Sequence, residues 1–108
     1  MDERTRRLAE NETIFRAGNE AISTNLAGDH ELTCLCECGA DTCFERIAVT
    51  RAAYEAVRAH PERFLVALGH DDRTAGEVVV ATDSRYAVVE KLFGARSIAE
   101  QTDPRRTR

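Results

Sequence analysis

The sequence predicts a single α+β domain, with a long amino-terminal helix, a small and mainly antiparallel sheet, one further helix and a zinc knuckle at one end of the sheet. Three observations predict it: helical periodicity at the start, β-branched runs later, and all four cysteines within residues 34–43. The chain has 108 residues, 43% of them hydrophobic and 31% charged, as in an ordinary globular domain. We expect this zinc-stabilised domain over residues 1–101 and a flexible tail over 102–108, which lacks an apolar anchor.

The first helix is expected from Glu3 to about Ala27, followed by Gly28 as its end signal. Its apolar residues recur at spacings near three, four and seven, with charged residues between them. This pattern predicts an amphipathic helix. The apolar residues that define its buried face are Leu8, Ile14, Phe15, Ala21, Ile22 and Leu26.

Two short strands should flank the cysteine turn, one over residues 32–36 entering it and one over 44–49 leaving it. The side chain of Thr50 can then cap a second helix over residues 51–59. This helix should stop before Pro61, because a residue that precedes proline is pushed out of helical geometry.

Three further runs, 63–68, 77–82 and 86–92, are rich in β-branched and aromatic residues and should form strands. Polar turn residues at 69–72 and 83–85 connect them. We therefore expect a three-stranded meander.

The cysteines follow the pattern C-x-C-x-C-x4-C and comprise Cys34, Cys36, Cys38 and Cys43. A thiolate cluster of this density suits a soft divalent ion held tetrahedrally, with zinc the first choice. Two alternatives are buried structural cysteines without a metal, and a redox pair formed by Cys36 and Cys38. A reducing compartment favours metal ligands over disulfides.

The fourth ligand could be Cys34 or a histidine. Cys34 lies two residues before Cys36 in an expected strand, so both side chains point the same way. His70 is the best histidine, because it stands in a Gly-His-Asp turn directly after an apolar strand. His60 precedes a proline at a helix end, and His30 lies in a charged turn.

The route of the chain from Cys43 to His70 bears on this choice. A helix of nine residues is shorter than the usual crossover between parallel strands. We therefore expect the strands 44–49 and 63–68 to be antiparallel, which would bring His70 back to the cysteines and complete a Cys₃His site with Cys36, Cys38 and Cys43.

Charge and hydropathy set aside several classes of function. The net charge of −4 argues against a broad basic surface for nucleic acid. No apolar run approaches the roughly 20 residues that cross a bilayer. Residues 1–7 are polar rather than an apolar signal core, so we expect a cytoplasmic protein.

Three functions fit these residues. The favoured one is a non-enzymatic zinc module that binds another protein through its amino-terminal helix or an acidic face. The second is a thiol or metal sensor that releases zinc on oxidation. The third is a hydrolytic zinc enzyme in which Glu37 or Asp41 is the base, and it requires only three protein ligands.

Short motifs spread over most of the chain carry a resemblance: Phe15-Arg16, Asn19-Glu20, Ile22, Cys36-Glu37-Cys38, Cys43, Arg46-Ile47, Thr50, Tyr54-Glu55-Ala56-Val57-Arg58, Pro61, Arg63-Phe64, Gly69-His70, Tyr86 and Val88-Val89-Glu90-Lys91. Together they resemble a family of small, uncharacterised actinobacterial proteins with a Cys-Glu-Cys knuckle and a downstream Pro-Gly-His turn.

The resemblance implies that Cys36, Cys38, Cys43 and His70 belong together, whereas Cys34 stands where the family has an ordinary apolar strand residue. One departure is Leu68, which replaces the proline that precedes Gly69-His70 in the family. The family brings no established activity, so the resemblance sharpens the site and leaves the function open.

Overall fold

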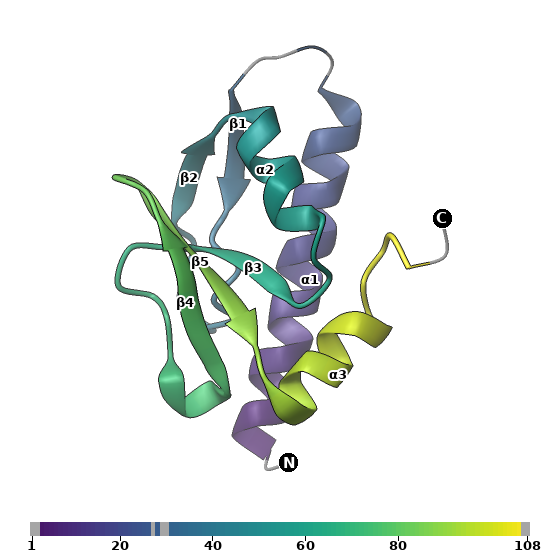
Figure 1. Cartoon of the computed structure of the whole chain (residues 1–108), viewed down its shortest axis with the longest axis vertical. Coiled ribbons are helices and arrows are strands. Elements are labelled where there is room, and N and C mark those ends of the chain that lie inside the picture. The colour runs from purple at the N-terminus through teal and green to yellow at the C-terminus, as the bar shows by residue number, and fades with distance from the viewer. Residues whose placement is uncertain (1–2, 27, 29–30, 107–108) are drawn as a thin grey trace.

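The computed structural model describes residues 3–26, 28 and 31–106. Figure 1 shows a long helix beside two small sheets and two shorter helices, which confirms the expected α+β class. The elements are α1 (Glu3–Asn25), β1 (Leu32–Leu35), β2 (Arg46–Val49), α2 (Arg51–Arg58), β3 (Arg63–Ala67), η1 (Arg73–Ala75), β4 (Glu77–Thr82), β5 (Tyr86–Lys91) and α3 (Phe93–Gln101). Helix α3 was not expected from the sequence, and Ala27, the expected end of the first helix, lies outside the described residues.

The strands form two antiparallel sheets rather than one. β1 pairs with β2, and the second sheet has the order β3-β5-β4. The expected meander order is wrong, because β5 lies between β3 and β4. Burial explains this order: three consecutive residues of β5, Ala87, Val88 and Val89, are buried, whereas β4 is exposed after Glu77. β2 and β3 lie in separate sheets, so the antiparallel return expected between them is not a strand pairing.

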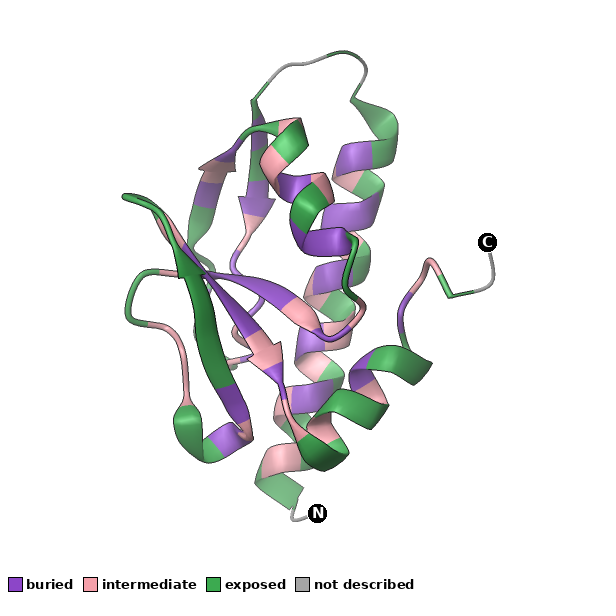
Figure 2. Ribbon diagram, in the orientation of Figure 1, coloured by how far each residue is buried: buried purple, intermediate pink, exposed green. Residues whose placement is uncertain are grey.

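α1 runs along the whole molecule, but its buried face is not the apolar face that the periodicity predicted (Figure 2). Ile14 is 66% exposed and Leu26 is 46% exposed. The residues that α1 buries are mostly polar or charged: Ala9, Glu12, Arg16, Asn19, Glu20 and Ser23. Within the described ranges, no helix combines the length and the apolar character that crossing a membrane requires.

Each buried charge of α1 meets a partner from a distant element. Lys91 of β5 lies between Glu12 and Glu77 and bonds to both carboxylates. The guanidinium of Arg16 stacks over the ring of Phe64, 4.4 Å from its centroid. Such pairing is what makes the burial of ionised groups tolerable, since an unpaired buried charge is strongly destabilising.

The carboxyl-terminal segment is anchored, contrary to the expectation of a tail without contacts. Asp103 is buried and forms an ion pair with the fully buried side chain of Arg58. Arg105 forms ion pairs with Glu20 and Glu55. Charge pairing rather than apolar burial thus holds residues 102–106, while residues 107–108 lie outside the described residues.

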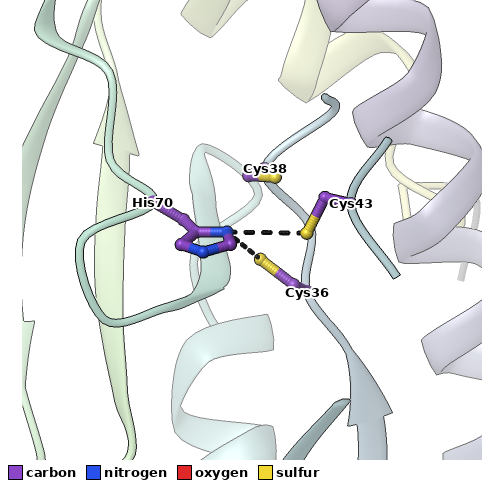
Figure 3. A group of neighbouring side chains, drawn as sticks. All are labelled: Cys36, Cys38, Cys43 and His70. Atoms are coloured by element: carbon purple, nitrogen blue, oxygen red, sulfur yellow. Dashed lines mark hydrogen bonds between the residues drawn. The ribbon is translucent and has the colours of Figure 1, made fainter. Parts of the chain in front are cut away.

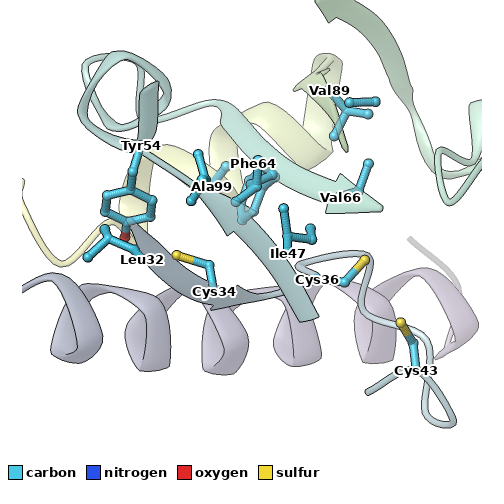
Figure 4. Packing of buried hydrophobic residues seen from close by; sticks show 13 residues of the cluster. Leu32, Cys34, Cys36, Cys43, Ile47, Tyr54, Phe64, Val66, Val89 and Ala99 are labelled. Atoms are coloured by element: carbon cyan, nitrogen blue, oxygen red, sulfur yellow. The ribbon is translucent and has the colours of Figure 1, made fainter. Parts of the chain in front are cut away.

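The apolar core lies between α1, α2 and the two sheets (Figure 4). Tyr54 enters it from α2, whose amino terminus is capped by the Thr50 side chain, as expected, through a hydrogen bond from Ala53 N. Members of the core with at most 2% exposure include Leu32, Ile47, Val49, Tyr54, Phe64, Leu65, Val66 and Val89. Cys36 and Cys43 lie at one end of this core, so the cysteine turn grows directly out of it.

Candidate metal centre

The cysteine turn is held by backbone hydrogen bonds at its start and its finish. Directly after β1, the N–H of Cys36 donates to the carbonyl of Glu45 at 2.9 Å. Near the end of the turn, the N–H of Cys43 donates to the carbonyl of Ala40 at 3.1 Å. These two bonds fix the two ends of the knuckle, residues 36–43, and Cys38 lies between them.

Gly39 lets this loop press against α1. Its φ of +81° lies in the left-handed region, and a Cβ at this position would lie 2.7 Å from the carbonyl oxygen of Leu8. Only glycine satisfies both conditions without strain. On the same side, the Asn11 amide of α1 donates to the carbonyl of Gly39 at 2.9 Å and to Asp41 at 2.8 Å. The knuckle thus packs directly against α1.

His70 reaches the cysteines from the connection between β3 and β4. The chain turns at Gly69, with φ of +79°, and the N–H of His70 donates to the carbonyl of Ala67 at 3.0 Å. The two segments of the candidate site are therefore brought together by the end of β3.

Figure 3 shows the four side chains pointing toward one another. Nδ1 of His70 lies 3.6 Å from Sγ of Cys36 and 3.5 Å from Sγ of Cys43, and with Cys38 all four ligand atoms lie within 4.8 Å of one another. Zinc bond lengths place nitrogen and sulfur about 3.6 Å apart in a tetrahedral site. The distances from Nδ1 of His70 to the sulfur atoms of Cys36 and Cys43 thus already match the nitrogen–sulfur distance of a tetrahedral zinc site.

Two thiols of the site, Cys36 and Cys38, shift each other's pKa. A hydrogen bond between Cys36 and Cys38 lowers the pKa of Cys38 and raises the pKa of Cys36. Cys36 is 2% exposed, whereas Cys38 and His70 are half-buried. A divalent ion would replace the proton of the hydrogen bond between Cys36 and Cys38, since zinc binds the thiolate form.

Cys34, the alternative fourth ligand, is not part of this group. It is fully buried in β1 opposite Ile47, among the core residues (Figure 4). Burial raises the pKa of Cys34 to about 12, so this residue stays a neutral thiol. His60 is exposed at the end of α2, and its Nδ1 lies 3.8 Å from Oε1 of Glu62. His30 lies outside the described residues.

The two carboxylates considered as bases both accept hydrogen bonds from other residues of the protein. Glu37 is buried, and its two oxygens accept hydrogen bonds from Leu65 N at 2.9 Å and from the Asn19 amide at 2.7 Å. Asp41 is exposed and accepts the hydrogen bond from Asn11. Asn11 and Asn19 therefore orient the knuckle from α1, a role for which the sequence pattern holds no signal.

A cavity of about 300 Å³ opens beside the candidate site. Cys38 and His70 line it, together with Arg4 and Asp72, which form an ion pair at 3.3 Å. Two of the four ligand side chains are thus accessible from solvent, whereas Cys36 and Cys43 are enclosed.

Fold and site together define an α+β protein with a Cys₃His group that could hold a metal ion. The chain matches no protein-family model, no curated protein and no solved structure. The resemblance to the actinobacterial family therefore stays a prediction.

Proposed function

We propose that this chain is a small cytoplasmic zinc-binding protein, in which zinc is structural and the folded unit acts as a module that binds another protein. The observation that carries the proposal is the convergence of Cys36, Cys38, Cys43 and His70 within 4.8 Å. Three thiolates and one imidazole form a ligand set typical of structural zinc, because soft sulfur ligands select zinc over magnesium or calcium.

A structural role for the ion is favoured because it would connect two segments that are far apart in the sequence. The knuckle and the β3–β4 connection are separate segments, and His70 lies 34 residues after Cys36. A metal linking them would bind the folded chain much more tightly than the unfolded one, so its binding free energy would add to the stability of the fold. The contribution should matter here, because much of the interior beneath α1 is charged rather than apolar.

A non-enzymatic role is favoured by the coordination number and by the surroundings. Four protein ligands leave no open position for a metal-bound water. Glu37 has both oxygens hydrogen-bonded to Leu65 and Asn19, and Asp41 is held by Asn11. Neither carboxylate is arranged to take a proton from a water at the metal.

For the protein partner, the outward side of α1 is the proposed surface. It carries Ile14, which is 66% exposed, together with the exposed residues Glu10 and Ala17. Because the other side of α1 packs against the core, deleting this helix would unfold the chain. A photo-reactive residue at Ala17, with Glu100 of α3 as the control position, should give one defined adduct in the native cell for the first position only. Equal labelling from both positions would reject the helix as the docking surface.

The metal assignment is tested by zinc content and X-ray absorption on protein purified in reducing buffer. We expect about one zinc per chain, with three sulfur neighbours and one nitrogen neighbour. His70→Ala should lose the nitrogen neighbour, whereas His60→Ala, the matched control, should keep it. A folded protein without zinc would reject the metal assignment, and an oxygen neighbour from water in the unmodified chain would favour the hydrolytic enzyme.

A second candidate function, a thiol or metal redox sensor, is favoured by one observation. Cys38 is half-buried and lines the cavity of about 300 Å³, so a peroxide could reach its sulfur. Oxidation would form a disulfide with a neighbouring thiol and release the ion. Zinc release at micromolar peroxide, reversed by a thiol reductant, would support the sensor over a purely structural site.

A further inference from the structure

β4 is an edge strand whose outer side is open. The sheet order β3-β5-β4 leaves β4 with a neighbouring strand on one side only. In the part of the chain that the structure describes, no hydrogen bond other than those to β5 joins the backbone of residues 78–82 to another residue. The outward N–H and C=O groups of this segment are thus available for pairing.

The opposite edge of the same sheet is closed by the knuckle. On the outer side of β3, Leu65 exchanges hydrogen bonds with Glu37, and the N–H of Ala67 donates to Sγ of Cys36. At β1, the Asn19 amide similarly bonds to both backbone groups of Leu35. The fold therefore covers two strand edges with specific side chains and leaves β4 uncovered.

The side chains of β4 are those of a buried strand, yet they are exposed (Figure 2). Val78, Val79 and Val80 are each about 40% exposed, and residues 78–82 contain no charge and no proline. Lysine and proline are two of the devices that protect an edge strand from pairing, and residues 78–82 carry neither. Glu77, the charge nearest to the valines, is buried against Lys91 and does not protect the edge.

The charges at the two ends of β4 indicate which strand would pair with it. Arg73 lies before the strand and Asp83 directly after it; both are exposed, and neither forms an ion pair with another described residue. In an antiparallel pair of two identical strands, the start of one lies beside the end of the other. Each Arg73 would then meet Asp83 of the other copy, which gives two such contacts in the dimer.

We propose that β4 pairs antiparallel with β4 of a second copy of this chain, which joins two three-stranded sheets into one of six strands. A register that sets Val79 opposite Val80 of the second copy also sets Gly76 opposite Asp83 of that copy. Arg73, one turn earlier, then lies within reach of this carboxylate. Because the pairing uses the open edge of both copies, association stops at the dimer.

The β-bulge in β4 allows a substitution that should affect pairing between copies without disturbing the pairing of β4 with β5. Val79 pairs with Val89 and Ala81 with Val88, so Val80 has no partner on β5. Val80→Lys should therefore leave the fold intact while placing a charge on the shared edge. Leu26→Lys is the matched control, because Leu26 is also exposed and lies outside the sheet, directly after α1.

Sedimentation of the zinc-loaded chain at concentrations from about 1 μM to 1 mM tests the proposal. This concentration range is needed because a small interface binds weakly. We expect the mass to rise from 12.0 kDa toward twice that value. The Val80→Lys chain should stay monomeric, and the Leu26→Lys chain should dimerise like the unmodified chain. A monomer throughout, or a dimer that persists in the Val80→Lys chain, would overturn the pairing.

A charge exchange tests the orientation and does not depend on whether Val80→Lys folds. Arg73→Asp or Asp83→Arg alone sets like charges opposite each other twice, and each should raise the dimer dissociation constant about tenfold. The double variant restores opposite charges and should return to within about threefold of the unmodified chain. A double variant no better than the single ones would reject the antiparallel arrangement. These outcomes are independent of zinc content, so they separate this pairing from the function proposed for the metal site.

Discussion

The backbone N–H of Ala67 donates a hydrogen bond to Sγ of Cys36 at 3.1 Å. The carbonyl of the same Ala67 accepts a hydrogen bond from the N–H of His70 at 3.0 Å. One residue at the end of β3 thus orients a candidate ligand from each of the two segments of the site. Hydrogen bonds of this kind stabilise a thiolate and fix its direction, and they tune the affinity of metal sites.

Ala67→Pro removes this donor and is expected to weaken zinc binding about 10- to 100-fold. The N–H points away from β5, so the pairing within the sheet should survive the change. Ala67→Ser retains the N–H and is the control. Competition with a chelator measures the affinity, and equal affinities in the two variants would show that the hydrogen bond does not support the site.

Cys34→Ala should retain about one zinc per chain and lose only about 1 kcal/mol of unfolding free energy, because it removes a buried sulfur from the core. Cys38→Ala removes a ligand and should abolish tight binding. Zinc content after dialysis against a chelator, with urea unfolding of both variants, checks this contrast. Loss of zinc in both would make Cys34 a ligand.

Gly39→Ala should be more damaging than Gly69→Ala, although both glycines have φ near +80°. At Gly39 the new Cβ would lie 2.7 Å from the carbonyl of Leu8, whereas nothing lies within 4 Å of a Cβ at Gly69. We expect a cost of about 1 kcal/mol at Gly69 from the backbone alone, and at least about 2 kcal/mol more at Gly39. Thermal unfolding of the two variants compares them, and equal costs would mean that the knuckle can move away from α1.

Asp103→Ala should cost about 3 kcal/mol, because it takes away one partner of the fully buried Arg58. Glu100→Ala, at an exposed ion pair with Arg96, should change the stability by about 0.5 kcal/mol or less. Urea unfolding measures both. Deleting residues 102–108 should also destabilise the fold, in contrast to the expectation for an unanchored tail; a truncated chain of unchanged stability would show that these ion pairs contribute little.

Glu12→Gln should change how stability depends on pH. Burial raises the pKa of Glu12 to about 7, although Lys91 opposes this shift. The folded state therefore binds more protons than the unfolded state between about pH 4.5 and 7, and stability falls as the pH rises through this window. Relative to the unmodified chain, Glu12→Gln should gain on the order of 2 to 3 kcal/mol from pH 4.5 to 8. Parallel pH profiles from chemical unfolding would contradict this.

Much of the site could be predicted from local sequence. The cysteine spacing, the Gly-His-Asp turn after an apolar strand and the capping Thr50 are signals read within a few residues. The places of the strands along the chain follow in the same way, although several of their ends differ from the expected ones by one or two residues, because β-branched runs and turn residues act through local backbone preference. The choice between Cys34 and His70 was not local, since it depended on how two segments meet.

Tertiary structure alone decided which face of α1 is buried, which strand is central and where the carboxyl-terminal segment packs. Periodicity assigns apolar residues to the interior, so it directed Ile14 inward and Glu12 outward. Glu12 is buried because its partner Lys91 lies 79 residues away in sequence, and Arg58 and Asp103 are paired across 45 residues. A charge is tolerated in an interior only where partners meet it, such as the opposite charges at Glu12 and Arg58 or the carbonyls of Pro61 and Ala99 at Arg16, and that meeting is a property of the folded chain.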